Sequence, residues 1–186
     1  MAEAKSVHPV SQLYKLEKES PNKVYLRQPI AGQWHERTWS QTMDEARRIA
    51  AFMEQQDVKR GDRVASLSKN TAEWFITDFA CLIAGIVHVP LYASQSADDI
   101  RFILEDSEAK LIFVGKLDTW EQQEAGIPEN LIRIAMPYET MPADYQWQNI
   151  VDNYAPITGT PLPKLDDIMT IMYTSGSTGR PKGVVF

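Results

Sequence analysis

The stretch that decides the fold is VASLSKNTAEWFITDFACLIAGIVHVPLYASQSADDIRFILEDSEAKLIFV, residues 64–114. It opens with the short apolar run Val64–Leu67, which is typical of a buried strand. A second strand-like run, Ile86–Pro90, follows after about twenty residues. The residues between them, from Asn70 to about Ala84, predict a helix. A strand, a helix and a strand therefore follow one another.

Helix start and stop signals support this interpretation. Asn70 is followed three residues later by Glu73, which is the spacing of a capping box. Gly85 is suited to end the helix. Ser96 is likewise followed by Asp99, so a second capped helix is expected to begin at Ala97.

The same alternation continues beyond this point. The second helix is expected over Ala97–Asp106, and strands over Leu111–Val114 and Leu131–Ala135, with a short helix at Leu117–Glu124 between them. Strands that alternate with helices of about ten residues indicate βαβ units. The predicted fold class is α/β, with a mostly parallel sheet and helices on both faces.

The residues before this stretch predict a helix and a hairpin. Ser11–Lys18 is a short helix candidate, and residues 1–10 are expected to be a tail. Val24–Gln28 and Trp34–Thr38 are β-rich segments on either side of Ala31-Gly32, which has the chemistry of a hairpin turn.

A longer helix is expected from Ser40, as its N-cap, to about Gln56. Asp44 and Glu45 fall near its start, where the helix dipole favours acids. Its apolar residues recur at spacings of three and four and predict a core face of Met43, Ala46, Ile49, Ala50 and Met53.

Prolines become frequent between residues 136 and 166, which are expected to form a connector over the surface of the α/β body at 11–135. One helical turn is expected around Trp147–Val151. Asp167–Tyr173 then predicts a strand that leads into a loop, within a final unit at 167–186.

Composition excludes several classes of protein. The 186 residues are 44% hydrophobic and have a net charge of -6, which opposes binding to a nucleic acid backbone. The first residues contain no apolar core of a signal peptide. The most apolar stretch, Phe75–Tyr92, contains Asp78 and His88 and falls short of a membrane span. A cytoplasmic location is expected, and peripheral contact with a membrane surface is left open.

Four residues that invite a functional interpretation are better explained by packing. His88 lies between valines in an expected buried strand. Cys81, the only cysteine, can form no disulfide within the chain and is expected to be a small core residue. Trp34 beside the hairpin and Trp74 on a helix are also expected to pack.

The most informative segment is YTSGSTGRPKGVV, residues 173–185. Small residues allow close approach of the backbone to a ligand, and successive amides in such a loop can converge on an anion. Hydroxyl groups add donors, and Lys182 adds a compact positive charge that suits phosphate. A strand is expected on each side, so the segment predicts a phosphate loop between two strands.

Two other interpretations compete with this one. The nucleotide loop G-x-x-x-x-G-K-[ST] does not fit, because Gly176 and Gly179 are three residues apart and Pro181 precedes Lys182. Val184 and Val185 also favour a strand where that motif requires a helix. A plain Ser/Gly hairpin turn is the other alternative, and composition alone would favour it.

The complete string resembles the phosphate-binding loop of the adenylate-forming superfamily, which includes acyl-CoA ligases, luciferases and peptide-synthetase adenylation domains. Two upstream segments share the resemblance: Thr38–Ala50 and Leu82–Tyr92. The likeness covers the chain from about Ser11 onward. The run Val89-Pro90-Leu91-Tyr92 is more similar to long-chain fatty acyl-CoA ligases than to amino-acid adenylating domains.

The resemblance implies a set of ligand-binding residues and a reaction. The residues implied to bind the β- and γ-phosphates of ATP are Thr174, Ser175, Gly176, Ser177, Thr178, Gly179 and Lys182. Thr174 is also implied to help hold Mg²⁺, whereas Arg180 falls at a variable position and receives no role. The implied reaction forms acyl-AMP from a fatty acid and ATP, and coenzyme A then displaces AMP.

The resemblance also implies that the chain is an N-terminal portion of the large AMP-binding domain. The base and ribose contacts, a metal-binding glutamate, most of the acyl pocket and the mobile domain with its catalytic lysine are not recognised in it. We therefore expect the isolated chain to be inactive. A fatty acyl-AMP ligase, and a non-catalytic module that binds nucleotide or a partner, are the alternatives. Small molecules are the expected substrates, and self-association through the last strand is a further expectation.

Overall fold

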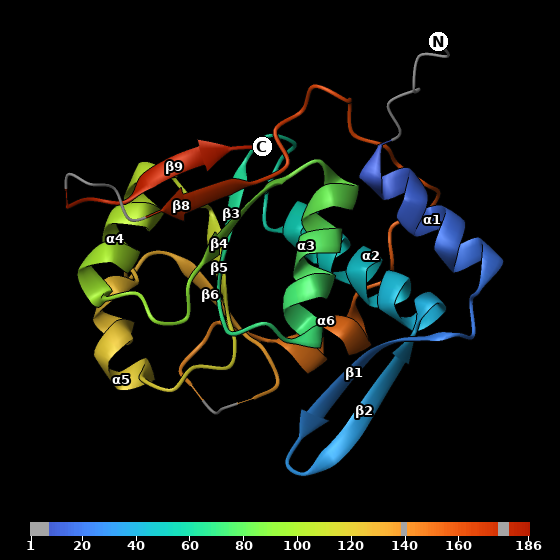
Figure 1. The fold of residues 1–186 in the computed structure, drawn as a ribbon, viewed down its shortest axis with the longest axis horizontal. Coiled ribbons are helices and arrows are strands. Elements are labelled where there is room, and N and C mark those ends of the chain that lie inside the picture. Colours follow the sequence, from blue (N-terminus) through green and yellow to red (C-terminus); the bar gives the residue numbers. More distant parts are fainter. Residues whose placement is uncertain (1–7, 139–140, 175–178) are drawn as a thin grey trace.

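A five-stranded parallel sheet forms the centre of the computed structural model, which describes residues 8–138, 141–174 and 179–186. The strand order is β4-β3-β5-β6-β7 (Figure 1). The strands are β3 (Arg63–Leu67), β4 (Val87–Leu91), β5 (Leu111–Val114), β6 (Ile132–Ala135) and β7 (Tyr145–Gln146). The chain adds β4 on one side of β3 and the later strands on the other, so the order reverses at β3.

Side chains of β5 show how both faces of the sheet are covered. Leu111 and Phe113 are buried against one set of helices, whereas Ile112 and Val114 are buried against the other. Apolar side chains on both faces are typical of a parallel sheet. The first face is covered by α2 (Trp39–Gln55), α3 (Ala72–Ala84) and α6 (Trp147–Asn153), and the second by α4 (Ala97–Asp106), α5 (Trp120–Gln123) and the 3₁₀ turn η1 (Glu124–Gly126). The predicted fold class is confirmed.

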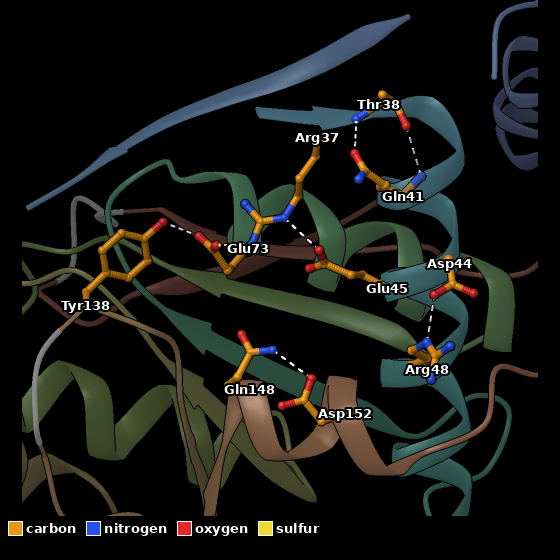
Figure 2. Close-up of polar contacts among 10 residues, drawn as sticks. All are labelled: Arg37, Thr38, Gln41, Asp44, Glu45, Arg48, Glu73, Tyr138, Gln148 and Asp152. Carbon is orange, nitrogen blue, oxygen red and sulfur yellow. Dashed lines mark hydrogen bonds and ion pairs between the residues drawn. The ribbon is translucent and has the colours of Figure 1, made fainter. Parts of the chain in front are cut away.

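The N-cap of helix α2 lies two residues before the predicted one. Thr38, and not Ser40, is the N-cap: its hydroxyl accepts from the amide of Gln41, whose side chain accepts from the amide of Thr38 (Figure 2). With Ser40 as the N-cap, Met43 would occupy the third helical position. A methionine there cannot complete a capping box, which needs a Glu or Gln side chain to accept from the amide of the N-cap residue. Asp44 therefore lies outside the first turn. The predicted core face of this helix is buried throughout.

Helix α3 also has a different cap from the one predicted. Thr71 accepts from the amide of Trp74, and the side chain of Gln28 accepts from the amide of Ala72. Glu73 therefore does not complete a capping box with Asn70. The other predicted signals are confirmed, because Gly85 ends α3 in the left-handed conformation and Ser96 caps α4 together with Asp99.

The first helix begins earlier than predicted. Helix α1 (Pro9–Glu19) begins before Ser11, and the His8 ring accepts a hydrogen bond from the amide of Val10. Proline is well suited to the first helical position, where its missing N–H costs nothing. His8 and Val10 are both buried. Residues 8–10 are therefore part of the packed structure.

The predicted hairpin is confirmed as β1 (Val24–Ile30) and β2 (Gln33–Thr38) around Ala31-Gly32. It projects from the body below the helices in Figure 1. The expectation that Trp34 packs is wrong: 69% of it is exposed, because its strand extends past the helices. Trp39, by contrast, is buried and stacks on Tyr25 with ring centroids 3.7 Å apart.

A largely buried polar cluster, which we call the Arg37 cluster, attaches the hairpin to the body (Figure 2). It consists of Arg37, Glu45, Glu73 and Tyr138. Arg37 donates from Nε to Glu45 and from Nη2 to Glu73, each at 2.8 Å, and the Tyr138 hydroxyl donates to Glu73. Burial raises the pKa of Glu45, and Arg37 opposes part of that rise. One arginine thus connects β2, α2 and α3.

The segment 136–166 is more than a surface connector. Within it, β7 pairs with β6 and extends the sheet, and α6 buries Trp147 and Ile150. The backbone carbonyl of Tyr154 accepts from Arg48 at 2.8 Å. The prediction of a single helical turn missed these contacts because a strand of two residues leaves no pattern. Of the helices that the structure describes, none is long and apolar enough to cross a membrane.

Candidate functional site

The expected phosphate loop belongs to a two-stranded ribbon beside the sheet. Its strands are β8 (Ile171–Thr174) and β9 (Lys182–Val185), and β8 is shorter than the predicted Asp167–Tyr173. The backbone of His88 in β4 accepts from the hydroxyl of Thr170 and donates to the carbonyl of Met169. Because the bridge between His88 and Thr170 is parallel, Thr174 lies toward the carboxyl edge of the sheet.

The ribbon brings the two ends of the predicted site together. Thr174 and Lys182 are directly opposite each other in the antiparallel ladder, and both are exposed. Such pairs have Cβ atoms about 5 Å apart. Gly179 has a φ of 88°, a left-handed conformation that suits glycine. Ser175, Gly176, Ser177 and Thr178 lie outside the described residues.

This pair has the chemistry that a phosphate site needs. Lys182 supplies three ammonium donors, and Thr174 supplies a hydroxyl. Among the described residues, no carboxylate lies within ion-pair distance of Lys182, so none of these residues neutralises its charge. A polyphosphate at this position would therefore meet a cation and a hydroxyl together.

A pocket of about 480 Å³ adjoins the ribbon. It opens at the carboxyl ends of β3 and β4, which is where ligands bind in open α/β sheets. Its wall is mostly apolar, and Ser68, Lys69 and Asn70 are the polar residues that line it. The lining residues are Ser68, Lys69, Asn70, Trp74, Pro90, Leu91, Tyr92, Ala93, Met172 and Tyr173.

Contacts on the other side of β3 explain why the pocket lies toward β4. The Ser68 hydroxyl accepts from the amide of Lys116 at 3.1 Å, and Lys69 pairs with Asp118. A Cβ atom at Gly115 would lie 2.3 Å from the Ser68 oxygen. The segments that follow β3 and β5 are thus in direct contact, whereas the pocket lies on the β4 side.

A serine, a histidine and an aspartate form a chain of hydrogen bonds next to this pocket. His88 Nε2 is 2.8 Å from the Ser66 hydroxyl, and His88 Nδ1 is 2.8 Å from Asp78. The arrangement has the order of a hydrolase triad, but Ser66 is fully buried and cannot reach a substrate. The interpretation of His88 as a satisfied core residue is confirmed. Cys81 is also fully buried, and Trp74 is half-buried against the His88 ring.

The described residues provide little protein ligation for a metal ion. No group of three or more histidine, cysteine, aspartate or glutamate side chains lies close enough together in this part of the chain. Thr174 offers one hydroxyl oxygen. A magnesium ion bound here would be held largely by substrate phosphates, which is common for Mg²⁺.

The chain belongs to the AMP-binding enzyme family, whose sequence pattern matches residues 15–186. The class is therefore that of adenylate-forming ligases. The chain is 30% identical over 183 residues to the long-chain-fatty-acid–CoA ligase FadD15 of Mycobacterium bovis, covering 93% of this chain and 30% of the relative. It is 35% identical over 153 residues to the 2-succinylbenzoate–CoA ligase of Bacillus licheniformis, covering 81% of this chain and 29% of the relative.

Solved structures share the fold. An anthranilate CoA ligase, AuaEII, in complex with anthranoyl-AMP aligns with a TM-score of 0.81 at 22% identity, over 96% of this chain and 34% of that one. An acyl-CoA synthetase of Brucella canis aligns with a TM-score of 0.79 at 24% identity, over 97% and 33%. The chain spans about a third of the length of these proteins.

Sequence reasoning did not identify the pocket. Its residues follow strands β3 and β4, and the rule that ligands bind at carboxyl ends of parallel strands could have indicated Ser68–Asn70 and Leu91–Ala93. The contribution of β8 could not be inferred in this way, because its position beside β4 depends on contacts between residues that are 82 apart in the sequence.

Proposed function

We propose that this chain is the N-terminal, phosphate-binding part of an ATP-dependent ligase that converts a fatty acid to acyl-AMP and then to acyl-CoA. The observation that supports this most directly is the pairing of Thr174 with Lys182 across the ribbon, in a chain of the AMP-binding family. ATP, Mg²⁺ and coenzyme A are the implied small molecules. The location proposed is the cytoplasm.

The residues present fit a role in the first step. When bound, Mg²⁺ would neutralise negative charge on the phosphates. Lys182 would hold the β- and γ-phosphates as a point charge, and the Thr174 hydroxyl would orient them and contribute a ligand to the metal. As pyrophosphate leaves, the charge that develops would meet donors that are already in place. We further propose that Ser175, Gly176, Ser177, Thr178 and Gly179 complete this loop.

A fatty acid of long chain length is the substrate that we propose. Support comes from the similarity to a long-chain-fatty-acid–CoA ligase over 93% of this chain and from the run Val89–Tyr92. The similarity to a 2-succinylbenzoate–CoA ligase favours a second candidate, a ligase for another carboxylic acid. A fatty acyl-AMP ligase and a non-catalytic binding module remain alternatives. We propose that the isolated chain forms no acyl-CoA.

A titration followed by nuclear magnetic resonance tests the phosphate site on the chain itself. Mg·ATP and, separately, pyrophosphate should shift the amide signals of Thr174, Gly179 and Lys182. We expect a dissociation constant on the order of 1 mM, which corresponds to only about 4 kcal/mol. Micromolar affinity for ATP would instead mean that a site for the base already exists within these residues.

Matched lysine variants make the test specific. Lys182→Ala should abolish the shifts, because it removes the only point charge proposed at the site. Lys110→Ala should leave them unchanged, since this exposed lysine lies at the amino end of β5, at the opposite edge of the sheet. Equal binding by the two variants would rule out the proposed site.

A further inference from the structure

Helix α4 contacts the two chain segments, here called arms, that flank the loop: the arm before it contains Tyr173 of β8, and the arm after it contains Arg180, two residues before β9. Figure 1 shows the ribbon of β8 and β9 lying next to α4. On the arm before the loop, the Tyr173 hydroxyl donates to Oδ2 of Asp106 at 2.6 Å. Tyr173 is only 4% exposed and packs in the same apolar cluster as Ile103 and Leu104 of α4. The residue immediately before Thr174 is therefore held by both a hydrogen bond and packing.

The shape of the ribbon is adapted to the Tyr173 ring. Gly183 lies opposite Tyr173 in the ladder. A Cβ atom at Gly183 would lie 3.3 Å from Cζ of Tyr173 and 3.0 Å from Cγ2 of Ile171, closer than side chains ordinarily pack. Glycine at this position leaves room for the ring to lie across the ribbon and reach α4. Burial, with help from Asp106, raises the pKa of Tyr173, so its hydroxyl keeps the proton that it donates.

The arm after the loop reaches the same helix through Arg180. Its guanidinium carbon is 5.5 Å from the centroid of the Phe102 ring, within the range of a cation–π contact. Asp98, Asp99 and Glu105 line the same pocket as Arg180 and favour a positive charge there. Arg180 thus faces α4, which agrees with its having no role as a phosphate ligand.

We propose that α4 positions the phosphate site: Tyr173 through Asp106, and Arg180 through Phe102, hold the two arms so that Thr174 and Lys182 stay opposite each other. This inference rests on the proposed function for its phosphate part. In this proposal Tyr173 and Arg180 are positioning residues that act through their contacts with α4. Preorganised donors bind a ligand without an ordering cost, so loosening either arm should weaken phosphate binding.

Hydrogen exchange of the backbone amides tests the anchoring without any ligand. In Tyr173→Phe, which removes only the hydroxyl, amides of β8 and β9 should exchange roughly tenfold faster or more, as the loss of a bond to a carboxylate predicts. Amides of β3 and β5 should keep their rates. Tyr145→Phe is the matched control, because its hydroxyl bonds to Gln56 at the far edge of the sheet.

Variants at Asp106 and Arg180 separate positioning from general stability. Asp106→Asn keeps an acceptor, so the amides of β8 and β9 should exchange at the rates of the parent. Asp106→Leu should accelerate their exchange as much as Tyr173→Phe does. Combining Asp106→Leu with Tyr173→Phe should accelerate it no further. Arg180→Ala should also accelerate exchange in β9. Arg27→Ala, at an exposed ion pair on the other hairpin, should not. Uniformly faster exchange in all strands would overturn the proposal.

Pyrophosphate titrations of the same variants complete the test. We expect Tyr173→Phe, Asp106→Leu and Arg180→Ala to bind roughly three- to tenfold more weakly than the parent. Suppose that the parent binds pyrophosphate through Lys182, and that the three variants show the same exchange rates and the same affinity as the parent. The positioning role is then wrong, and the proposed function stands. If exchange responds as expected but the parent shows no binding that depends on Lys182, the proposed function fails and the anchoring by α4 is retained.

Discussion

Replacement of Arg37 by methionine should destabilise the chain far more than the same replacement at Arg27. Both arginines belong to the β1–β2 hairpin and both pair with glutamate. The Arg37 side chain is 15% exposed and its partner Glu73 is 0% exposed, whereas Arg27 and Glu36 are 64% and 46% exposed. The comparison therefore varies burial while it keeps the residue type and the hairpin constant.

The expected loss of unfolding free energy depends on which charges each substitution leaves buried. Removal of one partner from a buried ion pair costs about 3–5 kcal/mol, because a charge stays buried without compensation. Here Glu45 and Glu73 would face each other without their shared cation. An exposed pair contributes only about 0.2–1 kcal/mol. With a slope of about 2 kcal/mol per molar urea, the midpoint should fall by about 1.5–2.5 M for Arg37→Met and by less than about 0.5 M for Arg27→Met.

Urea unfolding, followed by tryptophan fluorescence and circular dichroism, measures the two midpoints. A triple variant that combines Arg37→Met with Glu45→Gln and Glu73→Gln should recover much of the loss, because it removes the buried charges together with the arginine. Arg37→Lys should lie between the parent and Arg37→Met, since an ammonium cannot bond to both carboxylates with fixed geometry. Equal midpoints for the Arg37 and Arg27 methionine variants would refute the reasoning.

Two further predictions concern pH and association. Burial raises the pKa of Glu45 above its ordinary value of 4.5, so between the two values the folded chain holds a proton that the unfolded chain releases. The stability that this proton contributes is present at low pH. It is lost as the pH rises through the raised pKa. Urea midpoints measured at several pH values should fall less with rising pH in Glu45→Gln than in the parent. The same dependence of the midpoint on pH in both proteins would contradict this prediction. Val184 and Val185 of β9 are exposed, as is Phe186 directly after it, and among the described residues β9 pairs only with β8. We therefore expect concentration-dependent self-association that Val184→Lys reduces. Light scattering that shows a monomer for the parent at high concentration would count against it.

Local sequence signals predicted the order of the elements but not their start residues. The run of strands and helices over residues 64–114 was predictable because buried strands and capped helices leave strong patterns. Where two cap residues compete, as Thr38 with Ser40 and Asn70 with Thr71, the choice depends on partners elsewhere. Gln41 returns a bond to Thr38, and tertiary contacts direct Glu73 toward Arg37 instead of toward a cap.

The arrangement of the proposed phosphate loop was predictable only in part, for a related reason. A strand, a loop and a strand imply that residues at the two ends of the loop meet, and Thr174 and Lys182 do so. Nothing local indicates what holds the ribbon in place. Tyr173 meets Asp106 across 67 residues of sequence, and such contacts follow from the packing of α4 and β8 and not from any pattern in either segment.

The central claim is that the segment from Thr174 to Lys182 binds the phosphates of ATP. Its most direct test is the rate of acyl-AMP formation by the longer enzyme to which we propose this chain belongs, with Lys182→Ala and Thr178→Ala compared with Lys110→Ala. The loss of a preorganised donor should lower the rate on the order of 100-fold. Because Lys182 is exposed, Lys182→Ala should change the free energy of unfolding by less than about 0.5 kcal/mol, and its melting temperature should barely move. Parental rates at limiting ATP in both loop variants would contradict the claim.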